Sequence, residues 1–126
     1  DQAIHTWQNQ FGLPLSHRAD LPEIGIRQAF FLLEDNTFLE LIAPMGEQSP
    51  IEKVLESRGE GVHTLALKVD DLDATVANLE SQGVQLMGVG TPQVFIHPKS
   101  ANGVRVQLWP STRPHRWQDK PSEGSK

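Results

Sequence analysis

The stretch DQAIHTWQNQFGLPL, residues 1–15, has the same pattern as DATVANLESQGVQL, residues 73–86. Each stretch is typical of an amphipathic helix that ends at a glycine and leads into a strand. Further along, FLELIAP (38–44) corresponds to VRVQLWP (104–110), and both predicted strands end at a proline. The chain therefore repeats one module of about 60 residues, and a duplicated module fixes the architecture.

The second copy shows the full order of elements. A strand, VHTLALKV (62–69), precedes its helix, and the strand patterns VQLMGV (84–89) and QVFIHP (93–98) follow the helix. The first copy begins at Asp1 inside its helix, without the opening strand. We predict an α+β fold of paired βαβββ modules in which the first strand of module 1 is absent. Because an exposed sheet edge invites pairing, we expect either residues ahead of Asp1 or a homodimer that covers the edge.

The middle of the chain joins the two modules. GIRQAFFLLE (25–34) and TFLELIA (37–43) are predicted to form a hairpin with a two-residue turn at Asp35-Asn36. SPIEKVLESRG (49–59) is predicted to be a linker helix, since a serine can cap it, a proline occupies its first position and a glycine ends it. The predicted boundaries are residues 1–44 for module 1, 45–60 for the linker and 61–110 for module 2.

The C-terminal stretch, residues 111–126, combines prolines, glycine and polar residues without periodicity. Such a composition is typical of a flexible tail. Trp117 is the one residue suited to dock it onto the domain.

Length, charge and composition narrow the function class. A chain of 126 residues suits one domain, and a net charge of −5 argues against nucleic-acid binding. The absence of cysteine excludes disulfides and thiolate ligands. No apolar run approaches the roughly 18 residues of a membrane span, and we expect a cytoplasmic protein.

Three stretches carry a family resemblance: GVHTLALKVDDLDATVANLESQGVQL (61–86), FIHPKSANGV (95–104) and LELIAP (39–44). Together with the paired βαβββ pattern they resemble the vicinal oxygen chelate (VOC) superfamily, which includes glyoxalases, dioxygenases and bleomycin-resistance proteins. The closest branch is that of methylmalonyl-CoA epimerase. The resemblance implies that the modules curl into an open cup in which side chains hold a divalent metal.

Strand alternation predicts which side chains face the inside of this cup. In FLELIA, the charged Glu40 alternates with leucines. In HTLALKV, Leu65, Leu67 and Val69 form the face under the helices, and in VRVQLW the apolar set is Val104, Val106 and Leu108. The residues predicted to face the cup are therefore Glu40, Thr64, Ala66, Lys68, Arg105 and Gln107.

The resemblance also gives these positions roles. Glu40 falls on a metal-ligand position, and Gln107 falls on a ligand glutamate. Thr64 falls on a ligand histidine, because Gly61-Val62-His63-Thr64 stands where the epimerase motif has Gly-x-His-His. Gln28 falls on a second catalytic glutamate, and the resemblance places another ligand histidine on the absent first strand.

These replacements share one direction, from strong ligands to a hydroxyl and carboxamides. Neutral oxygens bind a catalytic divalent ion weakly, and an amide cannot take up a proton near neutral pH. We therefore expect no cofactor, and the alternative is one divalent ion of Ni, Co, Mn or Zn. In that alternative Glu40 is the metal ligand.

The expected site divides into catalytic and binding residues. Glu40 and Gln107 are the catalytic candidates, and the substrate-binding candidates are Arg105, Thr64, Gln28 and Lys99. Arg105 could clamp a carboxylate, or it could form a structural pair with Glu40. Lys99 is either a solvated charge or a contact to a CoA phosphate.

The histidines are given structural roles or none. His63 is expected to pack on the helix side, and His97 to make a turn contact. His5, His17 and His115 have no partner spacing, so no role is assigned to them.

Two functions remain open. The first is a VOC protein that binds a small organic molecule, anionic or of thioester type, through a degenerate metal site. The second is a divalent-metal-dependent isomerase or lyase of the methylmalonyl-CoA epimerase or glyoxalase I type. A histidine on a strand ahead of Asp1 would favour the second.

Overall fold

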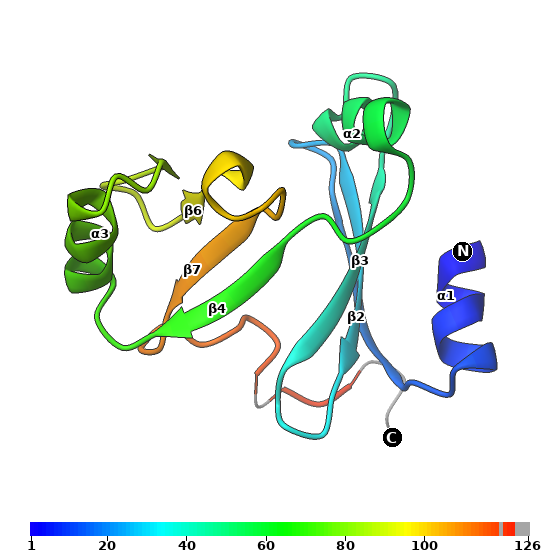
Figure 1. The fold of residues 1–126 in the computed structure, drawn as a ribbon. Helices are drawn as coiled ribbons and strands as arrows, with labels where there is room; N and C mark the ends of the chain where they lie inside the picture. Colours follow the sequence, from blue (N-terminus) through cyan, green and yellow to red (C-terminus); the bar gives the residue numbers. More distant parts are fainter. Residues whose placement is uncertain (119, 123–126) are drawn as a thin grey trace. The chain divides into compact units, whose positions relative to one another are not determined.

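The computed structural model describes residues 1–118 and 120–122, and the chain divides into two compact units. Unit 1 holds residues 1–60 and the chain from Arg116 onward, and unit 2 holds residues 61–115. Each unit has its own sheet (Figure 1). The predicted α+β class is confirmed. Within the described residues, no helix combines the length and apolar character needed to cross a membrane.

Unit 1 is an antiparallel three-stranded sheet with a helix at each end of its sequence. The strands occur in the order β1-β2-β3, each paired with the next along the chain. Figure 1 shows α2 at one end of this sheet and α1 beside it. The elements are α1 (Gln2–Ile4), η1 (His5–Gln10), β1 (Leu15–Leu21), β2 (Ile26–Leu32), β3 (Phe38–Pro44) and α2 (Pro50–Arg58).

Two helices of unit 1 were predicted from the sequence, and both are present. The first departs from α geometry, because η1 is a π-helix in which the amide of Phe11 donates to the carbonyl of Thr6 at 3.0 Å. Although the helix was predicted to be amphipathic, its apolar Phe11 is 59% exposed and packs edge-on against Trp7. At α2, the Ser49 hydroxyl accepts from the amide of Ile51 at 3.3 Å, the cap that the sequence predicted.

The turn between β2 and β3 differs from the prediction. The amide of Leu33 donates to the carbonyl of Thr37 at 2.8 Å, so the loop contains three residues rather than two. Asn36 adopts φ 64°, the left-handed conformation that a three-residue hairpin loop requires. The Thr37 amide donates to the Asp35 carboxylate at 3.2 Å and holds the turn. The sequence therefore located the hairpin but not its turn type.

Unit 2 is a βαβββ module with strand order β4-β7-β6-β5. β4 runs parallel to β7, and the other pairs are antiparallel. Asp71 caps α3 by accepting from the amide of Ala74 at 3.0 Å. The elements are β4 (Leu65–Val69), α3 (Leu72–Ser81), β5 (Leu86–Met87), β6 (Val94–Ile96), the 3-10 helix η2 (Pro98–Ser100) and β7 (Val106–Pro110).

The strands of unit 2 are shorter than predicted, and β5 shows why. β5 ends at Met87, and the next residue, Gly88, has φ 75°. A Cβ at Gly88 would lie 2.1 Å from the carbonyl oxygen of Gln93, so the chain turns back here against its own backbone. The predicted six-residue strand is therefore limited to Leu86–Met87.

The strand register of unit 2 confirms which residues share a face, but two leucines that were predicted to be buried are exposed. Val106 and Leu108 join Val76 of α3 and Val94 in the core. Leu65 and Leu67, which were predicted to lie under the helices, are each 48% exposed. The reason is that β4 is the edge strand of the sheet, and α3 packs mainly over β7.

The chain after β7 contains turns in its described part. The predicted flexibility of residues 111–126 stays a prediction, and Asp119 and residues 123–126 lie outside the described residues. Trp117 packs against unit 1: its ring stacks on that of His17 at 4.3 Å between centroids, with an interplanar angle of 9°. The docking role considered for Trp117 is thus present.

Candidate functional site

The polar cluster of unit 1 lies on one face of its sheet. In the register, Phe30 of β2 is opposite both His17 of β1 and Glu40 of β3. Directly opposed residues project to the same face, and Gln28, two residues before Phe30, joins them. The site face of unit 1 is defined here by His17, Gln28, Phe30 and Glu40.

Gln28 and Glu40, both predicted from the sequence, are brought together across β2 and β3. The Gln28 amide Nε2 donates to Glu40 Oε2 at 2.9 Å. Glu40 is an exposed residue overall, yet partial burial of its carboxyl raises the pKa above its ordinary value, while the hydrogen bond from Gln28 and the charge of Arg116 act to lower it. Glu40 is thus a carboxyl whose ionised form is held by a neutral amide.

Arg116 and Trp117 complete this face, and neither was among the predicted site residues. Arg116 Nη2 donates to Gln28 Oε1. Its guanidinium lies 5.2 Å from the ring centroid of Phe30 and 4.9 Å from that of Trp117. The segment lacks periodicity, so only the isolated tryptophan in a polar stretch gave a signal.

His17 is a second residue to which the sequence assigned no role. It is 3% exposed, and its Nε2–H donates to the carbonyl of Pro121 at 3.0 Å. Among the described residues, no partner bonds its buried Nδ1. Its position on β1 could have indicated that it faces the site, but the sequence analysis predicted only the start of this strand.

In unit 2, Arg105 makes contacts that the sequence did not predict. Arg105 Nη1 donates to His63 Nε2 at 3.1 Å, and its guanidinium lies 4.2 Å from the ring centroid of Phe95. His63 was expected to pack on the helix side, but it lies with Arg105 instead. Alternation holds for Arg105, which lies over Phe95 on the face of Gln107. It fails for His63, which precedes the start of β4 at Leu65.

The other predicted residues of unit 2 are placed individually. Gln107 is half-buried and pairs in register with Phe95 and Ala66, on the face away from the core. Thr64 is half-buried just ahead of β4. Lys99 is exposed on η2, and its amide donates to His97 Nδ1 at 3.0 Å, which is the turn contact predicted for His97. The convergence of these residues with Glu40 stays a prediction.

The donor set does not fit a catalytic divalent ion. Across residues 1–118 and 120–122, no group of three or more His, Asp or Glu side chains is placed to hold a metal. Thr64 and Gln107 offer neutral oxygens, and Glu40 accepts a hydrogen bond from Gln28. A catalytic site of this kind uses about three anionic or imidazole ligands.

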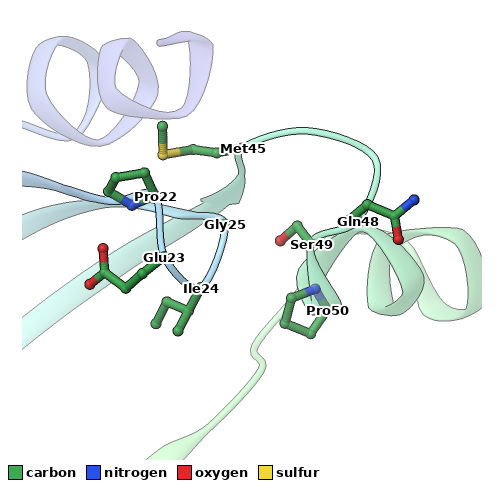
Figure 2. Close-up of a pocket in the computed structure, with 8 residues that line it drawn as sticks. All are labelled: Pro22, Glu23, Ile24, Gly25, Met45, Gln48, Ser49 and Pro50. Atoms are coloured by element: carbon green, nitrogen blue, oxygen red, sulfur yellow. The ribbon is translucent and has the colours of Figure 1, made fainter.

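A surface pocket of about 390 Å³ lies at the end of the unit 1 sheet, away from the predicted residues (Figure 2). Its walls are the β1–β2 loop and the segment that enters α2. Glu23 is the one acidic residue of its lining, and Ser49 is engaged in capping α2. The lining residues are Pro22, Glu23, Ile24, Gly25, Met45, Gln48, Ser49 and Pro50.

Comparison with known proteins decides the family. Residues 1–107 match the Glyoxalase/Bleomycin resistance protein/Dioxygenase superfamily. This chain belongs to that superfamily. The resemblance seen in the sequence is therefore confirmed.

The similar proteins point to the epimerase branch. The mitochondrial methylmalonyl-CoA epimerase of Dictyostelium discoideum is 36% identical over 115 residues, which cover 85% of this chain and 69% of that protein. The crystal structure of methylmalonyl-CoA epimerase from Mycobacterium tuberculosis is 38% identical, with a TM-score of 0.72 and coverage of 88% and 80%. A methylmalonyl-CoA epimerase in complex with methylmalonyl-CoA and NH4+ is 28% identical, with a TM-score of 0.72 and coverage of 89% and 87%.

Proposed function

We propose that this VOC protein binds a small anionic organic molecule, an acyl-CoA thioester of the methylmalonyl type, through a site that does not depend on a divalent metal. The ligand class comes from the similarity to methylmalonyl-CoA epimerases, one of which has been solved with methylmalonyl-CoA. The observation that carries the metal-independent part is the Gln28–Glu40 pair, in which a neutral amide faces the carboxylate.

Among Gln28, Glu40, Thr64 and Gln107, only Glu40 can act as an acid or a base near neutral pH. Inverting the carbon next to a thioester requires a base on one face and an acid on the other. Gln28, Gln107 and Thr64 cannot exchange a proton near neutral pH. Glu40 can take up and return a proton on one face of the carbon, which exchanges that proton with solvent and keeps the configuration.

The proposal is tested by calorimetric titration of methylmalonyl-CoA, propionyl-CoA and free CoA into the protein in EDTA. We expect one ligand per chain and a tighter complex for methylmalonyl-CoA than for free CoA. Addition of Mn²⁺ or Co²⁺ in place of EDTA should leave the affinity unchanged. Binding that appears only with added metal would contradict the proposal.

The second candidate function is a divalent-metal-dependent epimerase. It is favoured by the 36% and 38% identity to proteins named methylmalonyl-CoA epimerase and by the stretch HPKSANGV (97–104). In that case Glu40 would be a metal ligand, with further ligands outside the described donor set. Metal analysis after dialysis separates the candidates, since about one divalent ion per chain supports the second.

A further inference from the structure

Trp117 and Pro121 of the C-terminal segment contact the site face of unit 1 at two points. The Trp117 ring stacks on His17 and meets Phe30 edge-on, with ring centroids 5.9 Å apart. The carbonyl of Pro121 accepts from His17 Nε2 at 3.0 Å. Aromatic pairs of this geometry attract each other beyond the effect of area burial, so these contacts hold Trp117 against β1 and β2.

This fastening places the guanidinium of Arg116 over the polar cluster. The guanidinium rests on the rings of Phe30 and Trp117, and its Nη2 donates to Gln28 Oε1. Gln28 in turn donates from Nε2 to Glu40. The partners therefore fix the orientation of the Gln28 amide: its oxygen faces the Arg116 guanidinium, and its nitrogen faces the Glu40 carboxylate.

The charge of Arg116 is only partly used by these contacts. A guanidinium has five N–H donors in a planar fork that matches the two oxygens of a carboxylate. In unit 1, Gln28 accepts from one of these donors, and the guanidinium carbon lies over the rings of Phe30 and Trp117. Because the side chain is already held in place, binding a carboxylate would cost little further rotamer entropy.

We propose that Arg116 is the ligand-binding residue that recognises the free carboxylate of the acyl group, the role that the sequence analysis considered for Arg105. Arg105 is held by His63 and Phe95 in unit 2. Gln28 and Trp117 act as positioning residues for Arg116. This inference rests on the proposed function and deepens it by naming the group that distinguishes a dicarboxylic acyl thioester from a simple one.

Calorimetry with Arg116→Ala and Arg116→Lys tests this role. Wild-type protein should bind methylmalonyl-CoA more tightly than propionyl-CoA, which lacks the carboxylate. Arg116→Ala should weaken methylmalonyl-CoA binding roughly 10-fold or more, as expected for loss of a charge-assisted hydrogen bond, and leave propionyl-CoA binding unchanged. Arg116→Lys should restore part of the discrimination, because lysine keeps the charge but lacks the fork.

The matched control is Arg113→Ala. Arg113 lies three residues away and also stacks on a tryptophan, 4.4 Å from the ring centroid of Trp109, but it donates to the carbonyl of Pro92 in unit 2. This variant should bind both thioesters like wild type. Melting temperatures of all variants show whether each is folded.

Three outcomes would overturn the role of Arg116. Equal weakening of both thioesters by Arg116→Ala means that the residue meets the CoA portion. Tighter binding by that variant means that the segment blocks the site. Unchanged discrimination means that another group reads the carboxylate.

A wild-type protein that binds neither thioester would overturn the proposed function but not yet the role of Arg116. Free methylmalonate then decides that role. Its binding by wild type and loss in Arg116→Ala would support the anchor. The absence of methylmalonate binding by wild type would overturn it.

Discussion

Gln28 donates a hydrogen bond from Nε2 to Glu40 Oε2 across 2.9 Å, at neighbouring positions of β2 and β3. Two carboxylates in this geometry would compete for one proton and separate their pKa values. An amide and a carboxylate do not. The hydrogen bond from Gln28 therefore stabilises the ionised form of Glu40. Of the four residues that define the site face, Glu40 is the one with a carboxyl group.

The pH dependence of stability should reveal Glu40. Burial raises its pKa in the folded state above the ordinary value of 4.5, so the folded protein binds more protons than the unfolded chain as this carboxyl titrates. Stability contributed by Glu40 is then greatest at low pH and is lost as pH rises through the folded pKa. Glu40→Gln keeps the acceptor for Gln28 and removes this loss.

Urea unfolding of wild type and Glu40→Gln at pH 4 and pH 7 measures the effect. The difference in unfolding free energy between the two proteins cancels the contributions of the other carboxyls. We expect it to favour the variant more at pH 7 than at pH 4. A larger advantage at pH 4 would mean that the pKa of Glu40 is lowered in the folded protein.

Gly88→Ala should be strongly destabilising, and Gly90→Ala is its matched control. Both glycines have positive φ, 75° and 87°, so both substitutions carry the same backbone strain. Only at Gly88 would the new Cβ meet an atom, the carbonyl oxygen of Gln93 at 2.1 Å. We expect Gly88→Ala to cost roughly 2 kcal/mol more than Gly90→Ala in urea unfolding. Equal costs would contradict the close approach at β5.

Arg105→Ala should lower stability, in contrast to the expectation from the sequence. A carboxylate clamp at Arg105, one of the two roles considered from the sequence, would make its loss affect ligand binding rather than stability. With His63 and Phe95 as partners, we expect a loss of about 1 kcal/mol or more in unfolding free energy. Arg105→Lys should recover part of it. A melting temperature equal to that of wild type, together with lost affinity, would restore Arg105 as the ligand anchor.

Much of the fold follows from local signals in the sequence. The glycine after the helix pattern locates α3, and Ser49-Pro50 locates α2. These signals are reliable because caps satisfy backbone groups of their own helix. Strand lengths are less predictable, since β5 is ended by the approach of Gln93 to Gly88, a contact between separate segments.

The candidate site was predictable only in part, for a related reason. Glu40 and Gln28 stand out because polar residues in apolar strands alternate with a fixed period. Arg116 and Trp117 lie in a segment without a period, and their place depends on the stacking of Trp117 on His17. Arg105 follows the alternation of its strand, but His63 lies two residues ahead of β4, where alternation no longer fixes direction.

The most direct test of the account follows the C2 proton of one stereoisomer of methylmalonyl-CoA in D2O. Proton NMR reports exchange, and a stereospecific mutase assay reports epimer formation, in EDTA and with added Co²⁺ or Mn²⁺. The account predicts that the protein binds the ligand but does not form the opposite epimer, either in EDTA or with added metal. Any exchange of the C2 proton should keep the configuration at C2 and should be lost in Glu40→Gln. Epimer formation that requires the metal and stops with EDTA would contradict it.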